Sequence, residues 1–310
     1  MRTQVGLDQA AAFVAERYAG RADKVAELGG GDWSRAYSFE LGGQPLVARF
    51  GEYGEDFEKD RAAMMFAGPD LPVPAVLEIG AAFGGSYAIS ERHFGAFLES
   101  LDRPRLERLM PALLRALDAL RLVPVPAGAS PVWPVGDPDL PLSWRDWLTA
   151  TLEDHEGGRV SGWRARLAES ASLDELFVVG ERELRALVPS CPELRHVIHL
   201  DLLNRNVLVS EDGTRLEAVF DWACSAYGDF VYDVAWLTFW APWHRALDAV
   251  GFRDVVIRHY ERTALAVPLM AERLRCYELH IGLVHLAYCT FARRDDELQE
   301  VAQRMTQLLG

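Results

Sequence analysis

The sequence predicts an α+β protein with two lobes, a small β-rich N-terminal lobe and a larger, mainly helical C-terminal lobe. Residues 1–93 alternate short apolar runs with glycine-containing turns, which is typical of antiparallel strands. Residues 94–310 carry long segments in which apolar residues recur at helical spacing. With 310 residues, of which 50% are hydrophobic, the chain is long enough to give each lobe its own core.

The N-terminal lobe is expected to contain a five-stranded sheet and the helix that interrupts it. A short amphipathic helix over Asp8–Tyr18 comes first, with Asp8 as its N-cap. Gly42-Gly43 marks a tight hairpin turn between the second and third strands. The expected strands and the internal helix, in chain order, are Val25–Leu28, Ala36–Leu41, Leu46–Phe50, the helix Glu55–Ala67, Val76–Ile79 and Tyr87–Ser90.

The C-terminal lobe is expected to be helical except for one hairpin. Val207–Val209 and Leu216–Phe220 are the two strands of that hairpin, and Pro124–Pro141, rich in proline and glycine, is a surface loop. The expected helices are Pro104–Leu122, Trp144–Leu152, Leu173–Val188, Val231–Trp240, Phe252–Ala264 and Leu269–Arg293.

The charge of the chain limits its partners. The formal net charge is −14, which argues against a nucleic-acid ligand because phosphate backbones need a basic face. An acidic field suits a cationic small molecule, although many acidic proteins carry such charge for solubility alone. No apolar run reaches the length of a membrane span, and the first ten residues lack the apolar segment of a signal peptide. We therefore expect a cytoplasmic protein without a membrane partner.

The segment from His199 to Asn206, with the hairpin and Asp221 after it, carries the strongest chemical signal. It spells H-x-D-x-x-x-x-N, then strand, turn, strand and Asp. Phosphoryl transfer needs a carboxylate that takes the proton of the acceptor hydroxyl, and Asp201 fits that role. It also needs oxygen ligands for Mg²⁺, and Asn206 and Asp221 fit because the hairpin returns Asp221 to the side of Asn206. The alternative is a buried loop in which Asp201 is a capping residue.

The N-terminal lobe offers residues that could hold a nucleotide. The turn Gly29–Ser34 lies between two strands, so its backbone N–H groups and Ser34 suit a lid over phosphates; the alternative is a flexible hairpin. Arg49 on the third strand is the candidate cation for the α- and β-phosphates, paired with Asp60 on the next helix. A surface arginine on an edge strand is the alternative. The adenine is expected at the backbone of Glu91 to His93, where the last strand of this lobe ends.

Several other functions fit the sequence less well. No G-x-S-x-G elbow is present, so acyl transfer has no nucleophile signature. The pairs Cys276/His280 and His285/Cys289 point to different sides of one helix, which favours packing over zinc binding. Few residues separate Asp221 from the next helix, which leaves no room for the long activation segment of a protein kinase. A non-catalytic nucleotide-binding module remains an alternative, but such a module would normally have lost one of the three key residues.

The sequence resembles the aminoglycoside phosphotransferase family over most of its length, with a weak match only at Leu122–Ser172. The resemblance implies a bilobal protein-kinase-like fold, with Asp201 as the base and Asn206 and Asp221 as metal ligands. It implies transfer of the γ-phosphate of ATP (or GTP) to a hydroxyl of an aminoglycoside-like acceptor, and Asp233 would brace the catalytic loop. The segments that carry it are Ser34–Phe39, Lys59–Arg61, Leu71–Pro74, Cys191–His196, His199–Asn206, Asp221-Trp222, Gly228-Asp229 and Phe239–Trp243.

Some positions depart from the pattern of the family. Leu200 and Leu203 replace smaller residues, Arg205 replaces a small or polar one, and Arg49 replaces the usual lysine. Cys224 stands where one member of the family carries an acid, so the identity of the acceptor is open. A non-cationic hydroxyl metabolite is the alternative acceptor. We expect a cationic acceptor to bind in an acidic cleft that contains Asp229, Glu278, Asp295, Asp296 and Glu297. For the last three, the alternative is that they are solvated surface acids.

Overall fold

The computed structural model describes residues 5–126, 129–132 and 143–310. The described chain forms two compact units. The first unit contains the residues up to Ala119 together with Leu203–Ser225, and the second contains Leu120–Leu202 and Ala226–Gly310. A β-sheet dominates the first unit and helices dominate the second, which confirms the predicted α+β class. The lobe boundary after residue 93 stays a prediction.

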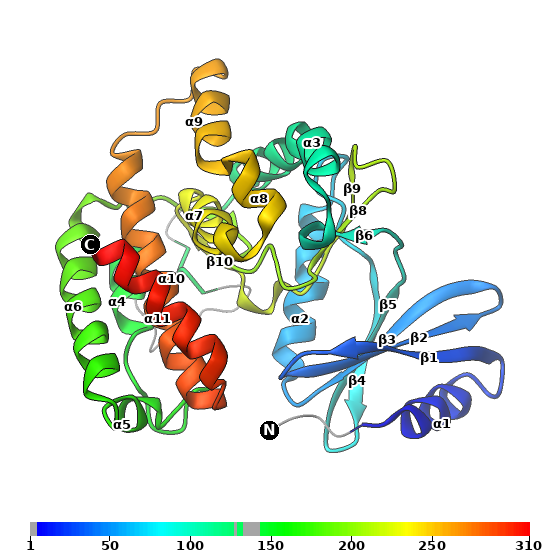
Figure 1. Ribbon diagram of the computed structural model, residues 1–310. Helices are drawn as coiled ribbons and strands as arrows, with labels where there is room; N and C mark the ends of the chain where they lie inside the picture. The colour runs from blue at the N-terminus through cyan, green and yellow to red at the C-terminus, as the bar shows by residue number, and fades with distance from the viewer. Residues whose placement is uncertain (1–4, 127–128, 133–142) are drawn as a thin grey trace. The chain divides into compact units, whose positions relative to one another are not determined.

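The first unit is built on a five-stranded antiparallel sheet with the strand order β1-β2-β3-β5-β4 (Figure 1). The turn between β2 and β3 uses Gly42 and Gly43 at φ +60° and +85°, backbone angles that a residue with a Cβ rarely adopts. Leu41 therefore pairs directly with Gln44. The strands are β1 (Ala22–Gly30), β2 (Ser34–Leu41), β3 (Gln44–Gly51), β4 (Val76–Ala82) and β5 (Gly85–Glu91).

The two faces of this sheet carry different residues because side chains alternate along a strand. On β3, Leu46, Ala48 and Phe50 are buried in the apolar cluster that α1 (Leu7–Arg17) covers. Arg49 lies on the opposite side, where it stacks over Phe57 of α2 (Gly54–Ala63). The N-cap of α1 is Gly6 and not Asp8, which lies in the first turn of the helix and faces its positive end. The prediction of the cap was wrong by two residues.

A second, three-stranded sheet of the first unit contains the predicted hairpin. β8 (Val207–Val209) pairs with β9 (Leu216–Val219), and β6 (Ala96–Phe97) adds to the other edge of β8. Val207, Val209 and Ala218 are fully buried, so the hairpin is fixed in an apolar environment. The helix α3 (Arg103–Leu122) follows β6 in sequence, and Pro111 lies within it.

The second unit is arranged around the long helix α10 (Met270–Ala292), which packs against α6, α7 and α11 (Figure 1). Its buried surface continues almost around the helix, as expected for a helix enclosed by others. The sequence did not predict α5, α8 or α11. The remaining helices are α4 (Trp144–Ala150), α5 (Trp163–Leu167), α6 (Ala171–Leu187), α7 (Val231–Trp240), α8 (Arg245–Val250), α9 (Phe252–Arg262) and α11 (Asp295–Leu309).

Two further sequence predictions concern the surface and the membrane. Within the predicted loop Pro124–Pro141, residues 127–128 and 133–141 lie outside the described part of the chain. Among the described residues, no helix is both long and apolar enough to cross a membrane.

Candidate active site

The loop that carries Asp201 begins at a two-stranded sheet of the second unit. β7 (His196–Ile198) pairs with β10 (Ala226–Gly228), and the chain then turns at Leu200, whose φ of +66° lies in the left-handed region. The imidazole Nδ1 of His199 accepts a hydrogen bond from the backbone N–H of Asp201 at 3.3 Å. His199 is fully buried, so this bond fixes the backbone of Asp201 against a rigid side chain.

Asp233 of α7 braces this turn, as the sequence predicted. One carboxylate oxygen accepts the backbone N–H of His199 at 2.9 Å and the other accepts that of Leu200 at 2.9 Å. Asp233 is 2% exposed, and burial raises its pKa from 3.8 to about 6 although both hydrogen bonds lower it. The carboxylate is thus mostly charged at neutral pH and satisfies two backbone donors that the turn leaves without partners.

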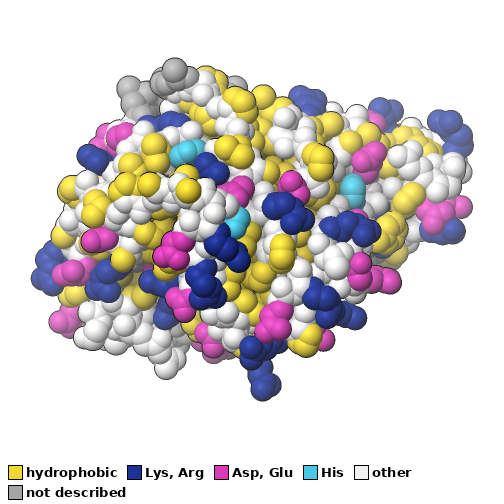
Figure 2. All heavy atoms as spheres, turned by 90° about the horizontal axis from the view of Figure 1, so that it is seen from above, with side chains coloured by type: hydrophobic (Ala, Val, Ile, Leu, Met, Phe, Trp, Pro, Cys, Tyr) yellow, Lys and Arg dark blue, Asp and Glu magenta, His cyan; other side chains and the backbone are white. Residues whose placement is uncertain are grey.

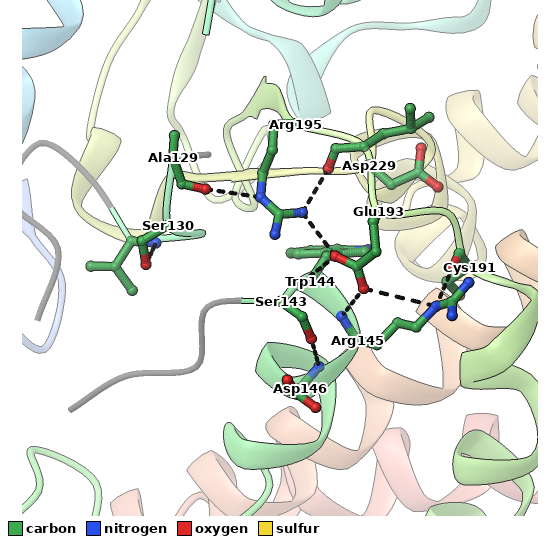
Figure 3. A network of polar contacts seen from close by, with 12 residues as sticks. Ala129, Ser130, Ser143, Trp144, Arg145, Asp146, Cys191, Glu193, Arg195 and Asp229 are labelled. Carbon is green, nitrogen blue, oxygen red and sulfur yellow. Dashed lines mark hydrogen bonds and ion pairs between the residues drawn. The ribbon is translucent and has the colours of Figure 1, made fainter. Parts of the chain in front are cut away.

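The segment that leads into β7 is held by a network around Glu193 (Figure 3). The Glu193 carboxylate accepts the backbone N–H groups of Trp144 and Arg145, at 2.8 and 3.1 Å, at the start of α4. It also pairs with Arg195, whose Nε donates to the carbonyl of Ala129 at 3.1 Å. This segment carries part of the family resemblance, but its sequence alone predicts no role for it. Its role in the structure is to tie the strand before Asp201 to α4.

The predicted metal ligands Asn206 and Asp221 lie at the same end of the β8–β9 hairpin. The backbone N–H of Phe220 donates to the carbonyl of Asn206 at 3.0 Å, which sets Asp221 beside Asn206 as predicted. Asn206 is 5% exposed, and the side chain of Asp221 is 40% exposed. Asp221 has a φ of +64°, so the chain reverses sharply at this residue before the short 3₁₀ helix η4 (Trp222–Cys224). The backbones of Asn206 and Asp221 are therefore close together, and one of the two oxygen-bearing side chains is buried while the other is partly open to solvent.

Arg49 forms the ion pair with Asp60 that the sequence predicted. One guanidinium nitrogen lies 2.9 Å from Asp60 and 3.6 Å from Asp221. The other carboxylate oxygen of Asp60 accepts the backbone N–H of Trp222 at 2.8 Å. Burial raises the pKa of Asp60 to about 6, although Arg49 and this hydrogen bond lower it, so Asp60 remains mostly charged at pH 7. Arg49 thus connects α2 to the residue proposed to bind the metal.

The structure places the remaining residues predicted to bind the nucleotide but does not test that role. Ser34 begins β2 and pairs with Gly51 of β3, directly after the glycine turn. The backbone N–H of Glu91 already donates to Ala75, and that of Arg92 donates to Pro45. His93 Nε2 lies 3.8 Å from the carboxylate of Glu91. An adenine contact at this segment would have to use backbone groups other than these two N–H donors.

Two of the acids expected in an acceptor cleft are not available to a ligand. Asp229 is fully buried and accepts two hydrogen bonds from Arg273, at 2.8 and 2.5 Å, and one from Tyr277 at 2.6 Å. Glu278 is 1% exposed and is held by Thr238 and Arg253. The prediction for these two was wrong because arginines distant in sequence neutralise both charges.

The other three acids, Asp295, Asp296 and Glu297, lie in the first turn of α11, where they face the positive end of the helix. Acidic and basic side chains are interspersed on the face shown in Figure 2, without a field of one sign. The face shown therefore gives no support to an acidic cleft.

The cysteine and histidine pairs of α10 belong to the core. His280 is buried; its Nε2 lies 2.8 Å from Thr151 Oγ1 and its Nδ1 lies 2.7 Å from Tyr232 Oη. Thr151 donates its own proton to the carbonyl of Trp147, so His280 Nε2 donates to Thr151 and Nδ1 accepts from Tyr232. Within the described ranges, no three His, Cys, Asp or Glu residues cluster as metal ligands.

The fold and these residues define a class of protein. A sequence model of the phosphotransferase enzyme family matches residues 24–269, and the chain belongs to this family. It is therefore a phosphotransferase, as the sequence predicted.

The chain is similar to hygromycin-B 4-O-kinase of Escherichia coli, with 33% identity over 287 residues, which are 88% of this chain and 76% of the relative. It also matches a thermostable mutant of aminoglycoside phosphotransferase APH(4)-Ia in ternary complex with AMP-PNP and hygromycin B. The TM-score is 0.81 at 29% identity, over 96% of this chain and 97% of the other. Spectinomycin phosphotransferase APH(9)-Ia shares the fold at 11% identity, with a TM-score of 0.64 over 98% of this chain and 95% of the other. These matches confirm the predicted kinase-like fold.

Proposed function

We propose that this protein transfers the γ-phosphate of ATP (or GTP), with Mg²⁺, to a hydroxyl of an aminoglycoside-like or other cationic small molecule. The observation that carries the proposal is the position of Asn206 and Asp221 at the same end of the hairpin, with Arg49 next to Asp221. A non-catalytic nucleotide-binding module would normally have lost Asp201, Asn206 or Asp221, and this chain keeps all three.

The residues fit a magnesium ion. A carboxylate and a side-chain amide supply the hard oxygen donors that Mg²⁺ prefers, and the exposed side of Asp221 leaves room for phosphate oxygens and water. Bound magnesium bridges the β- and γ-phosphates and offsets their charge. Asn206 and Asp221 would hold it, and the buried hairpin strands keep their backbones rigid.

Arg49 fits a phosphate. Its Nε is buried and has no hydrogen-bond partner among the described residues, while its terminal nitrogen already contacts Asp60 and Asp221. A buried donor without an acceptor destabilises the protein by roughly 1–3 kcal/mol, so a rearrangement that brings a phosphate oxygen to this N–H would recover that energy on binding. Arginine holds phosphate through its planar fork, which agrees with its presence where the family usually carries lysine.

Asp201 would orient the acceptor hydroxyl and take its proton. Its backbone is fixed by His199, and the residue before it is fixed by Asp233, so the carboxylate is presented from a rigid turn. A positioned base contributes about 10²–10⁴ in rate. The acceptor then attacks the γ-phosphorus while the leaving oxygen departs with the nucleoside diphosphate.

The acceptor class rests on the relatives, because the buried Asp229 and Glu278 no longer support it. Hygromycin B is the first candidate, since the relatives include hygromycin-B 4-O-kinase and a complex with hygromycin B. Cys224 is exposed and stands where the hygromycin enzyme carries an acid, which leads us to expect weak or altered activity on hygromycin B. A neutral hydroxyl metabolite is the alternative acceptor.

The test is a nucleotide-turnover screen against aminoglycosides, other antibiotics, amino sugars and neutral polyols. We expect turnover that needs Mg²⁺ and a cationic acceptor and that falls as salt rises. Efficient phosphorylation of only neutral or anionic compounds would contradict the acceptor class. Failure of both ATP and GTP with Mg²⁺ to raise the melting temperature at millimolar concentration would contradict the nucleotide site as well.

A further inference from the structure

Lys59 of α2 makes two hydrogen bonds to the turn that follows Asp221. Its ammonium donates to the carbonyl of Ala223 at 2.8 Å and to that of Ser225 at 2.9 Å. All four residues belong to the first unit, and Lys59 is partly buried. This side chain has no part in the phosphoryl transfer proposed above.

Lys59 and its neighbour Asp60 hold the same turn at three backbone groups. Asp60 accepts the N–H of Trp222, while Lys59 donates to the carbonyls on either side of Cys224. A carboxylate therefore binds the donor at one end of the 3₁₀ helix η4, and an ammonium binds the acceptors at its other end. Because Asp221 directly precedes η4, its backbone is fixed to α2 from the C-terminal side.

The composition of the chain makes this lysine unusual. Of the 32 basic residues only two are lysines, Lys24 and Lys59, and the other 30 are arginines. Lys24 is exposed and pairs with Glu40, an ordinary surface contact. Arginine is thus the cation at nearly every position of this chain, while Lys59 lies where two carbonyls of one turn converge on a single point. A compact ammonium with three rotatable donors fits that geometry better than a planar guanidinium.

We propose that Lys59 is a positioning residue for the metal, which acts by holding the η4 turn so that the Asp221 carboxylate faces the ion. The inference rests on the proposed function, because it takes Asp221 as a magnesium ligand. Groups that orient a metal ligand without touching the metal typically change its affinity by about 10- to 100-fold when removed. Loss of Lys59 should therefore weaken metal binding before it affects the acceptor.

The test uses Lys59→Met, which keeps an unbranched side chain one atom shorter and removes its donors, and Lys24→Met as the matched control. Mn²⁺ binding is measured by electron paramagnetic resonance on the full chain with ADP and without acceptor. We expect Mn²⁺ affinity to fall about 10-fold in Lys59→Met and to stay unchanged in Lys24→Met. Equal Mn²⁺ affinity in Lys59→Met and the unmodified chain, even with a lower melting temperature, would show a purely structural lysine and overturn the inference.

A second measurement on the unmodified chain covers the case in which Lys59→Met does not fold. Acetylation by an amine reagent is followed by mass spectrometry at the two lysines, which makes Lys24 an internal reference. Lys59 should react several-fold more slowly than Lys24, and Mn²⁺ with ADP should slow Lys59 alone. Equal rates, or a Lys59 rate that Mn²⁺ and ADP leave unchanged, contradict the inference. Absence of Mn²⁺–ADP binding by the unmodified chain would instead overturn the proposed function itself.

Discussion

Replacing Asp233 by asparagine tests how the loop of Asp201 is held. Asparagine keeps the shape but has one acceptor oxygen, so one of the N–H groups of His199 and Leu200 would face an NH₂ group. The shift of the pKa from 3.8 to about 6 already includes both hydrogen bonds, and it makes the charged side chain about 3 kcal/mol less favourable in the folded state than a neutral one. Because asparagine is neutral, we expect the variant at pH 7 to be at least as stable as the unmodified chain, by up to about 3 kcal/mol, but to show a clear loss of turnover.

The pH dependence separates these effects. An acid whose pKa is raised in the folded state stabilises that state fully below its unfolded pKa of 3.8 and loses this contribution as the pH rises through about 6. Urea unfolding should therefore show the unmodified chain gaining up to about 3 kcal/mol over Asp233→Asn as the pH falls from 7 to 4. Asp254→Asn, at an exposed acid of α9, controls for the loss of one carboxylate. A difference between Asp233→Asn and the unmodified chain that stays constant from pH 4 to 7, or full turnover by the variant, would refute the reasoning.

Three other substitutions test separate parts of the molecule. Asp201→Asn should lower turnover by about 10²–10⁴ and leave nucleotide affinity unchanged by calorimetry; near-normal turnover would contradict its role as base. Arg49→Ala leaves the buried Asp60 without its cation, so we expect about 3–5 kcal/mol of destabilisation in urea and weaker nucleotide binding, partly restored by adding Asp60→Asn. Burial lowers the pKa of His280 from 6.5 to about 3, so its contribution is full above pH 6.5 and falls by about 1.4 kcal/mol per pH unit below it. His280→Gln should flatten this acid limb of the urea stability curve, and an unchanged limb would show that His280 is not buried as a neutral group.

Residues that repeat at a clear period were predicted well. The five strands of the first sheet and the helix between them run in the expected order, because alternation and glycine turns are local signals. The helix α11 was missed although Leu298, Val301, Ala302 and Met305 recur at helical spacing and are all buried. The short strands β7 and β10 had no local signal, since each is three residues long and exists only because the other pairs with it.

In the candidate site, too, contacts between positions close in the sequence were predicted and contacts between distant positions were not. The pair of Arg49 and Asp60 was predictable, because a strand and the helix after it bring the two positions together and the lengths of the side chains match. The error at Asp229 had no local warning, since its partner Arg273 lies 44 residues further along the chain. A carboxylate in a sequence looks the same whether it faces water or an arginine in the core. Lys59, by contrast, could have been noticed from composition, because lysine is so rare in this chain.

The two aspartates proposed as base and metal ligand are held by the same arrangement, one in each unit. Leu200, directly before Asp201, and Asp221 itself both have left-handed backbone angles, at φ +66° and +64°, which destabilise a residue with a side chain by roughly 1–2 kcal/mol. In each case a buried carboxylate accepts a backbone N–H at the strained turn: Asp233 accepts that of Leu200 itself, and Asp60 accepts that of Trp222, directly after Asp221. Burial raises the pKa of both bracing acids to about 6, so each charged carboxylate carries a net desolvation penalty in the folded state. Each arrangement combines backbone strain with a desolvated charge, and the hydrogen bond between them fixes the backbone that presents the aspartate.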